Sequence, residues 1–150
     1  MTYLLDVNVL IALLDKAHVA HTDAQAWFED KGHRAWATCA ITENGFLRIV
    51  GGPKYRPAIG SPADVVPLLT RLHSLPGHQF WPDDFSLVSS PMVDARELRT
   101  SGQITDTYLL ALAVFHGGRL ATFDRRLSVR AVRGGRQALH VIPSTASSDA

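Results

Sequence analysis

The chain of 150 residues is poor in cysteine and has no long apolar run. Its single cysteine, Cys39, excludes an intrachain disulfide and a zinc site of several thiolates, so we expect Cys39 to lie in the core. The apolar N-terminal segment, residues 1–15, contains Asp6, Asn8 and Asp15 and lacks leading basic residues. These features fit neither a signal peptide nor a membrane-spanning helix. We therefore expect a cytoplasmic protein without membrane contact.

An excess of charge of one sign is also missing, because 15 Lys and Arg balance 14 Asp and Glu to a net charge of +1. This balance and a hydrophobic fraction of 46% exclude a disordered or polybasic chain. The balance is nevertheless uneven, since residues 96–136 contain eight arginines, no lysine and three acidic residues. Two interpretations stay open. The arginines reflect genomic base composition, or they form a phosphate-binding face, because guanidinium groups bind phosphate oxygens bidentately.

Short apolar runs alternate with helical stretches, and no repeat or linker divides the chain. We therefore expect a single domain at residues 1–143 and a short disordered tail at residues 144–150. The pattern predicts strands at residues 3–5, 34–38, 79–82, 119–123 and 139–142. It predicts helices at residues 9–15, 18–31, 40–50, 65–75 and 104–116. The last of these is a buried helix that we expect to end at Gly117 and Gly118.

This alternation of strands and helices is typical of an α/β protein with a mostly parallel sheet. In open sheets of this kind, ligands bind beyond the carboxyl ends of the strands. Asp6 and Asp124 each follow directly on a predicted strand, so we expect both side chains to point into that crevice.

Four carboxylates interrupt apolar elements instead of lying on a polar face: Asp6, Glu43, Asp106 and Asp124. Each has an ordinary structural interpretation. Asp6 and Asp124 fit caps of the helices that follow them. Asp106 fits the first turn of a helix, where the helix dipole favours negative charge. Glu43 fits a bond back to a nearby backbone amide.

Taken together, the four carboxylates indicate a metal site, because they lack an evident Lys or Arg partner and would repel one another if they converge. Mg²⁺ and Mn²⁺ prefer carboxylate and water ligands. Asn8 and Thr105 lie next to two of the acids and are expected to orient them or a bound water. Metal-bound water attacks phosphodiesters, so the pattern predicts phosphodiester hydrolysis.

Three segments carry a more specific resemblance: LLDVNVLIALLD at residues 4–15, TENGFLRIV at residues 42–50 and ITDTYLLALAVFHGGRLATFDRRL at residues 104–127. In this order and context, the chain resembles a PIN-domain ribonuclease, and more closely a VapC-type toxin of a bacterial type II toxin–antitoxin system. The resemblance extends over residues 1–127, with little signal between residues 51 and 100. It fills all four acidic positions of the family, in the order Asp6, Glu43, Asp106 and Asp124.

The resemblance implies a three-layer α/β/α sandwich around a central, mostly parallel sheet, with Mg²⁺- or Mn²⁺-dependent endoribonuclease activity. Asp6, Asp106 and Asp124 would hold the metal, and Glu43 would hold a second metal or the attacking water. The expected substrate is a tRNA or a ribosomal RNA. The resemblance also implies a homodimer and a small cognate antitoxin that inhibits the toxin.

Four arginines follow closely after Asp124: Arg125, Arg126, Arg130 and Arg133. If residues 125–133 are helical, Arg126, Arg130 and Arg133 share one face. This face would lie beside the metal site, where the RNA backbone has to lie, so we expect these arginines to bind RNA. Docking of the antitoxin is the competing use of the same charges.

Two other functions compete with the ribonuclease. A phosphatase of the haloacid dehalogenase type also begins with a strand that ends in Asp, but it needs a second Asp two residues later as general acid. Asn8 occupies that position here, and an amide does not donate and recover a proton. The non-catalytic alternative is a catalytically silent PIN-fold module that binds RNA or protein partners. Degradation of RNA that requires Mn²⁺ and stops with EDTA would decide against this module.

Overall fold

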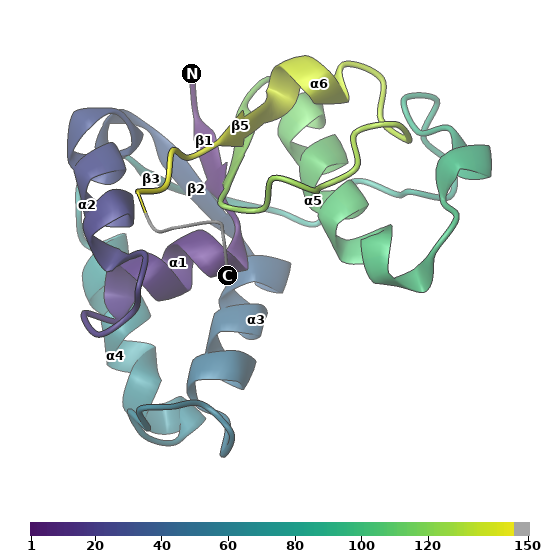
Figure 1. Cartoon of the computed structure of the whole chain (residues 1–150). Coiled ribbons are helices and arrows are strands. Elements are labelled where there is room, and N and C mark those ends of the chain that lie inside the picture. The colour runs from purple at the N-terminus through teal and green to yellow at the C-terminus, as the bar shows by residue number, and fades with distance from the viewer. Residues whose placement is uncertain (146–150) are drawn as a thin grey trace.

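A computed structural model describes residues 1–145, and a parallel β-sheet runs through the centre of the molecule (Figure 1). Its five strands are β1 (Tyr3–Leu5), β2 (Trp36–Cys39), β3 (His78–Trp81), β4 (Arg119–Thr122) and β5 (Leu139–Val141). They lie in the order β3–β2–β1–β4–β5, and each neighbouring pair is parallel. The predicted α/β class with a mostly parallel sheet is confirmed.

Helices cover both faces of the sheet. One face carries α1 (Val7–Leu14), α2 (His21–Asp30), α3 (Ala40–Val50) and α4 (Pro62–His73), which lie together in Figure 1. The other face carries α5 (Ile104–Phe115) and the short α6 (Gly135–Ala138). Three short 3-10 helices connect these elements: η1 (Gly32–Arg34), η2 (Ala95–Glu97) and η3 (Ser101–Gln103). The three-layer α/β/α architecture is therefore confirmed.

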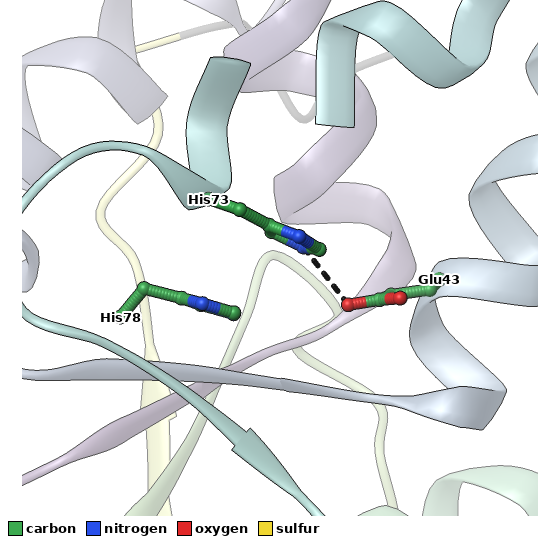
Figure 2. A group of neighbouring side chains, drawn as sticks. All are labelled: Glu43, His73 and His78. Atoms are coloured by element: carbon green, nitrogen blue, oxygen red, sulfur yellow. Dashed lines mark ion pairs between the residues drawn. The ribbon is translucent and has the colours of Figure 1, made fainter. Parts of the chain in front are cut away.

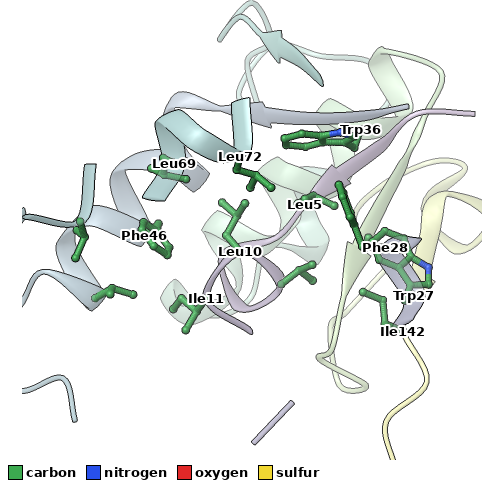
Figure 3. Close-up of a cluster of buried hydrophobic side chains, with 14 residues drawn as sticks. Leu5, Leu10, Ile11, Trp27, Phe28, Trp36, Phe46, Leu69, Leu72 and Ile142 are labelled. Carbon is green, nitrogen blue, oxygen red and sulfur yellow. The ribbon is translucent and has the colours of Figure 1, made fainter. Parts of the chain in front are cut away.

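Each face of the sheet has its own hydrophobic core. Under α1 to α4, Leu10, Trp36 and Phe46 are fully buried (Figure 3). Under α5 and α6, Leu110 and Cys39 are fully buried, so Cys39 is the core residue that its isolation in the sequence suggests. Successive strand residues point to opposite faces, which is why Trp36 enters one core and Cys39 the other. Burial of each large apolar side chain stabilises the fold by about 1.5–3 kcal/mol.

Local capping determines where the helices begin and end. Helix α3 has the predicted bounds, and α5 ends just before Gly117, whose φ of 70° is a left-handed conformation that glycine adopts without strain. Helix α4 begins at Pro62, earlier than its apolar spacing suggests. The reason is a capping box, in which the Ser61 hydroxyl accepts from the Asp64 N–H and the Asp64 carboxylate accepts from the Ser61 N–H.

Residues 125–133 are not helical, so the condition under which Arg126, Arg130 and Arg133 would share one helix face is not met. These residues form turns and extended backbone, and their ends pair with a distant part of the chain. The Arg133 N–H donates to the Met92 carbonyl at 2.8 Å, and the Asp94 N–H donates to the Ala131 carbonyl at 2.8 Å. These long-range bonds occupy backbone groups that a helix would need, so the segment cannot be helical as well.

Burial of apolar side chains holds the same segment in its non-helical path. Leu127 and Val132 both pack into the core under α5. The segment therefore has no helix face that could be shared by Arg126, Arg130 and Arg133. Their side chains extend from separate positions along a loop.

The end of the described chain is attached to α2. The Thr145 N–H donates to the Asp23 carboxylate at 2.9 Å, and the Ser144 hydroxyl donates to the same carboxylate at 3.4 Å. The other residues of the expected tail, 146–150, lie outside the described residues, so its disorder stays a prediction. Among residues 1–145, the structure contains no helix that is both long and apolar enough to span a membrane.

Candidate functional site

The C-terminal ends of β1 and β4 bring Asp6 and Asp124 to one edge of the sheet. The two strands are neighbours, with Leu5 opposite Ala121, and Asp6 directly follows β1. From β1 the sheet extends to β2 and β3 on one side and to β4 and β5 on the other, so the strand order reverses between β1 and β4. In open α/β sheets, ligands bind at this switch point.

Asp6 is held in one orientation by two hydrogen bonds. It caps the N-terminus of α1 and is only 6% exposed. One carboxylate oxygen accepts from the Val7 N–H at 2.7 Å, and the other accepts from the Thr122 hydroxyl at 2.8 Å. Asp6 is thus a helix cap, as its ordinary interpretation states, and this same role fixes a carboxylate at the switch point.

Thr122 connects the polar groups around Asp6. Its hydroxyl donates to Asp6 and accepts from the Asn8 amide and from the Asp124 N–H, both at 3.1 Å. A threonine hydroxyl has one donor and two acceptor positions, so all of them are used. The Asn8 carbonyl oxygen in turn accepts from the Phe123 N–H at 3.1 Å, which locks the Asn8 side chain beside the site.

Asp106 and Asp124 complete a cluster of three aspartates. Asp106 lies in the first turn of α5 and is partly buried. Asp124 follows β4 by two residues, and its carboxylate accepts from the Arg126 N–H at 2.8 Å. Thr105, which the sequence suggested as an orienting residue, has an exposed side chain at the start of α5.

Burial and neighbouring negative charge raise the pKa values of Asp6 and Asp106. Burial is the largest cause that raises the pKa of Asp6 from 3.8 to about 6, and the charges of Asp106 and Asp124 raise it further, against the bonds from Thr122 and Val7. Burial and the charge of Asp124 also raise the pKa of Asp106. The charge of Asp124 therefore disfavours ionisation of both Asp6 and Asp106, and the charge of Asp106 disfavours that of Asp6.

The donor set of this cluster fits a divalent cation. Among residues 1–145, the ion pairs involve other acidic residues, and none joins Asp6, Asp106 or Asp124 to a basic side chain. Hard cations such as Mg²⁺ and Mn²⁺ take carboxylate oxygens as ligands, and their charge would offset the repulsion.

A cleft of about 460 Å³ opens beside Asp106 and Asp124. Arg126 and Arg130, two of the arginines expected to bind RNA, line this cleft together with Arg99. The remaining lining residues are Glu97, Thr100, Gly102, Gln103, Thr107, Leu127 and Ser128. The lining of the cleft thus combines two aspartates of the cluster with three guanidinium groups.

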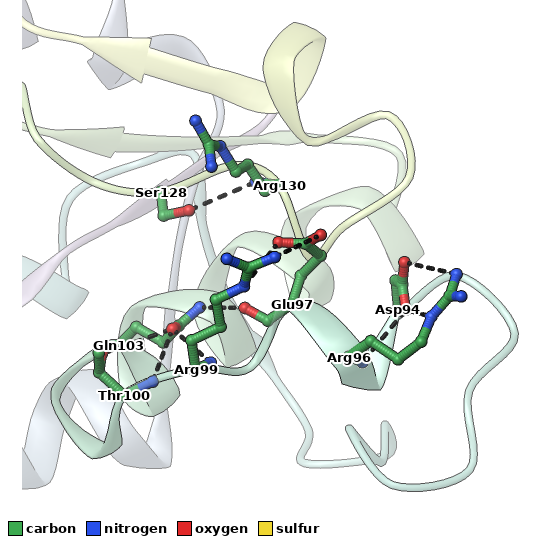
Figure 4. A network of polar contacts seen from close by, with 8 residues as sticks. All are labelled: Asp94, Arg96, Glu97, Arg99, Thr100, Gln103, Ser128 and Arg130. Carbon is green, nitrogen blue, oxygen red and sulfur yellow. Dashed lines mark hydrogen bonds and ion pairs between the residues drawn. The ribbon is translucent and has the colours of Figure 1, made fainter.

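One wall of the cleft is organised by a polar network around Gln103 (Figure 4). The Gln103 side-chain oxygen accepts from the backbone N–H groups of Arg99 and Thr100, at 2.9 and 3.0 Å. Its side-chain nitrogen donates to the Glu97 carbonyl at 3.0 Å. The Arg99 guanidinium pairs with the Glu97 carboxylate at 3.4 Å, which holds the arginine at the cleft.

The other two arginines expected to bind RNA lie elsewhere. Arg125 is exposed and is not among the residues that line this cleft. Arg133 is also exposed, and its charge helps to lower the pKa of Asp94, after the larger effect of the bonds from Arg96.

Glu43, the fourth expected acid, lies beside His73 and His78 (Figure 2). Its carboxylate accepts from the Thr38 hydroxyl at 2.6 Å and lies 2.9 Å from the His73 Nε2. The charges that raise the pKa of Asp6 are those of Asp106 and Asp124, and Glu43 is not one of them. The direct contacts of Glu43 are thus with β2 and α4, whereas the other three expected acids act on one another through their charges.

His78 of β3 belongs to the surroundings of Glu43. Its Nε2 lies 2.7 Å from the Thr38 hydroxyl, and its ring stacks on that of His73 with a centroid distance of 4.2 Å. Burial lowers the pKa of His78, and the charge of His73 lowers it further while Glu43 opposes this.

The sequence pattern did not point to Thr122, Arg99, His73 or His78. Thr122 was recognisable in principle, because it stands two residues before Asp124 on a predicted strand and therefore at the same edge of the sheet. The other three come from residues 51–100, where neither charge nor periodicity distinguishes a functional side chain from a surface one.

Known proteins resemble this chain over most of its length. The family model described as PIN domain matches residues 3–132. Ribonuclease VapC44 of Mycobacterium tuberculosis is 47% identical over 134 residues, which are 89% of this chain and 94% of that protein. Ribonuclease VapC39 of the same organism is 43% identical over 134 residues, 89% of this chain and 96% of that protein. Ribonuclease VapC38 is 41% identical over 121 residues, 81% of this chain and 84% of that protein.

Proposed function

Because the chain belongs to the PIN domain family, we propose that it is a VapC-type, metal-dependent endoribonuclease that cleaves RNA phosphodiesters. The observation that carries this proposal is the cluster of Asp6, Asp106 and Asp124 at the switch point of the sheet. Both relatives, VapC44 and VapC39, are named ribonucleases, which supports the same reaction.

Asp6, Asp106 and Asp124 would hold Mg²⁺ or Mn²⁺. Such an ion would supply an activated water and stabilise the charge that develops on the phosphate oxygens. The chain's own contribution is to fix the ligands before substrate arrives. Thr122 and Val7 orient the Asp6 carboxylate, and the Arg126 N–H orients that of Asp124.

For Glu43 we propose the role of holding a second metal or the attacking water. Its bond from Thr38 and its contact with His73 place a condition on this role. In this role the carboxylate would exchange its contact with His73 for one with a metal ion or a water molecule.

We also propose that the RNA backbone lies along the cleft beside the aspartates. Arg126 and Arg130 line this cleft, and Arg99 faces it from the opposite segment. Arg125 and Arg133 lie outside this lining, so they are proposed to contact a more distant part of the RNA or the antitoxin. The substrate that we propose is a tRNA or a ribosomal RNA in the cytoplasm, and the partners are a cognate antitoxin and a second copy of the chain.

Replacement of a single aspartate tests the catalytic proposal. In Asp106→Asn, Mn²⁺-dependent cleavage of total RNA should fall at least about 100-fold, since even residues that merely orient a metal ligand typically contribute about 10–100-fold. Asp94→Asn is the matched control, because Asp94 is paired with Arg96 and lies outside the cleft. Full cleavage by Asp106→Asn would contradict the assignment. Absence of cleavage by the unmodified chain with Mn²⁺ would instead favour the silent binding module.

Replacement of the cleft arginines tests the path of the RNA. In the Asp106→Asn background, which prevents cleavage, Arg126→Ala combined with Arg130→Ala should weaken RNA binding. The slope of log affinity against log salt should fall by about one for each phosphate that the variant no longer binds. Arg136→Ala is the control, because Arg136 is exposed on α6 and lies outside the cleft. An unchanged salt slope in the double variant would contradict the proposed path.

A further inference from the structure

Three side chains from three different elements lie close together in the structure (Figure 2). They are Glu43 on α3, His73 at the end of α4 and His78 at the start of β3. One carboxylate oxygen and one imidazole nitrogen from each histidine lie within 4.8 Å of one another. The chain thus brings together ligand atoms of two chemical types, oxygen and nitrogen, at a place where the sequence suggested only the acid.

The nitrogen of His73 in this cluster is buried and lacks a satisfactory partner. The His73 Nε2 makes no hydrogen bond of acceptable geometry, although the Glu43 carboxylate oxygen is 2.9 Å away. A buried polar atom without a hydrogen bond typically lowers the free energy of unfolding by about 1–3 kcal/mol. A further binding partner at the His73 Nε2 would remove this cost. A cation between the ring and the carboxylate would be such a partner.

The cluster lies near the surface and is internally oriented. The side chains of His73 and Glu43 are 31% and 20% exposed, although the His73 Nε2 itself is covered, so a turn of the ring would open this atom to an ion from solvent. The Thr38 hydroxyl bonds to both Glu43 and His78, at 2.6 and 2.7 Å, and thereby holds these two side chains on one side of the cluster. Hydroxyl groups that orient metal ligands in this way raise the affinity of metal sites.

The type of ligand indicates the type of ion. Two imidazoles with one carboxylate are a donor set for Zn²⁺ and for related ions such as Co²⁺, whereas an all-oxygen set suits Mg²⁺ and Mn²⁺. Tetrahedral ligand bonds to Zn²⁺ of roughly 2.0–2.2 Å place two ligand atoms roughly 3.3–3.6 Å apart. The His73 Nε2 and the Glu43 oxygen, now 2.9 Å apart, would therefore have to separate slightly to admit the ion. The stacked rings of His73 and His78 would also have to turn about their side-chain bonds so that one nitrogen of each points at the ion. Both residues border the short loop of residues 74–77.

We propose that Glu43, His73 and His78 form a binding site for a transition-metal ion of the Zn²⁺ or Co²⁺ type, in addition to the aspartate cluster. An ion at this site holds Glu43 on the side of α4 and β3. The site binds its ion whether or not the chain cleaves RNA, because its ligands include none of the three aspartates.

Metal titration of the tag-free, full-length Asp106→Asn variant tests this proposal. This background removes a ligand of the aspartate cluster, so the result does not depend on ribonuclease activity. Calorimetry with Zn²⁺ should give one ion per chain, and Co²⁺ should give a visible absorption spectrum that excess Mg²⁺ does not abolish. In the triple variant that adds His73→Gln and His78→Gln, Zn²⁺ affinity should fall at least tenfold. His33→Gln is the matched control, because the His33 ring lies outside the cluster and contacts the Phe28 carbonyl.

A measurement without substitutions in the cluster guards against variants that fail to fold. Ring proton signals of the histidines, followed by NMR during Zn²⁺ addition to the unmodified chain, should shift first for His73 and His78. Unchanged Zn²⁺ affinity in the folded triple variant, or His73 and His78 signals that stay in place at saturating Zn²⁺, would overturn the proposal. Loss of RNA cleavage with retained Zn²⁺ binding would separate failure of the proposed function from failure of this site.

Discussion

Replacing Asp6 with asparagine should stabilise the metal-free chain at neutral pH. Asp6 is 6% exposed, and burial with the charges of Asp106 and Asp124 raises its pKa from 3.8 to about 6. Since one pKa unit corresponds to about 1.4 kcal/mol, the ionised carboxylate costs the folded state about 3 kcal/mol. Asparagine has one acceptor oxygen where Asp6 uses two, so a lost hydrogen bond offsets about 1 kcal/mol of this gain. The expected net gain is therefore about 2 kcal/mol.

The gain should depend on pH, with a sign that follows from the raised pKa. Between about pH 4 and pH 6, the folded chain keeps a proton on Asp6 that the unfolded chain releases. The contribution of Asp6 to the free energy of unfolding of the unmodified chain therefore falls as pH rises through this window and is constant above it. Asp6→Asn lacks this contribution. The variant should be slightly less stable than the unmodified chain near pH 4 and more stable near pH 7.5.

Urea unfolding followed by tryptophan fluorescence, in EDTA and across this pH range, measures the difference. Asp64→Asn is the matched control, because bonds from Ser61 lower the pKa of Asp64 and its neutralisation should not stabilise the chain at neutral pH. A difference between Asp6→Asn and the unmodified chain that is independent of pH would refute the reasoning. So would a loss of stability near pH 7.5.

Three further outcomes follow from the same geometry. Thr122→Val removes the donor to Asp6 and should lower the free energy of unfolding by about 1–3 kcal/mol and weaken Mn²⁺ binding by calorimetry, whereas Thr122→Ser should retain both. Mn²⁺ should raise the melting temperature of the unmodified chain by an amount that increases with the Mn²⁺ concentration, and it should raise that of Asp6→Asn less. Gly118→Ala would drive a methyl group into the Thr2 carbonyl and should destabilise the chain more than Gly117→Ala, which meets open space but a left-handed φ, as urea unfolding would measure.

The fold and the meeting of three of the four expected acids at one edge of the sheet could be predicted because their signals are local. Asp6 and Asp124 stand at the ends of apolar strands, and Asp106 stands in the first turn of an apolar helix. Parallel strands end at the same edge of a sheet, so position in the sequence nearly determines position in space. The contacts of Glu43 could not be predicted in this way. They depend on His73, which lies in another helix and 30 residues further along the chain.

The sequence does not indicate the non-helical path of residues 125–133, for a related reason. Its arginines and valines have helical spacing, but the competing partners, Met92 and Asp94, stand more than 30 residues earlier in a region without a strong pattern. Hydrogen bonds between segments so far apart leave no trace in local periodicity. The same limit hid Arg99, whose place at the cleft depends on the network around Gln103.

The backbone pairing between residues 92–94 and 131–133 has a mechanical consequence for the cleft. The two walls, which carry Arg99 and Arg130, are continuations of these paired segments. Main-chain bonds therefore join the two walls, which restricts how far their backbones can separate or close. The Arg99 guanidinium is held further by its pair with Glu97, whereas none of the ion pairs among residues 1–145 involves Arg130. A polyanion in this cleft would therefore meet one guanidinium group that is held in place and one that adjusts to it.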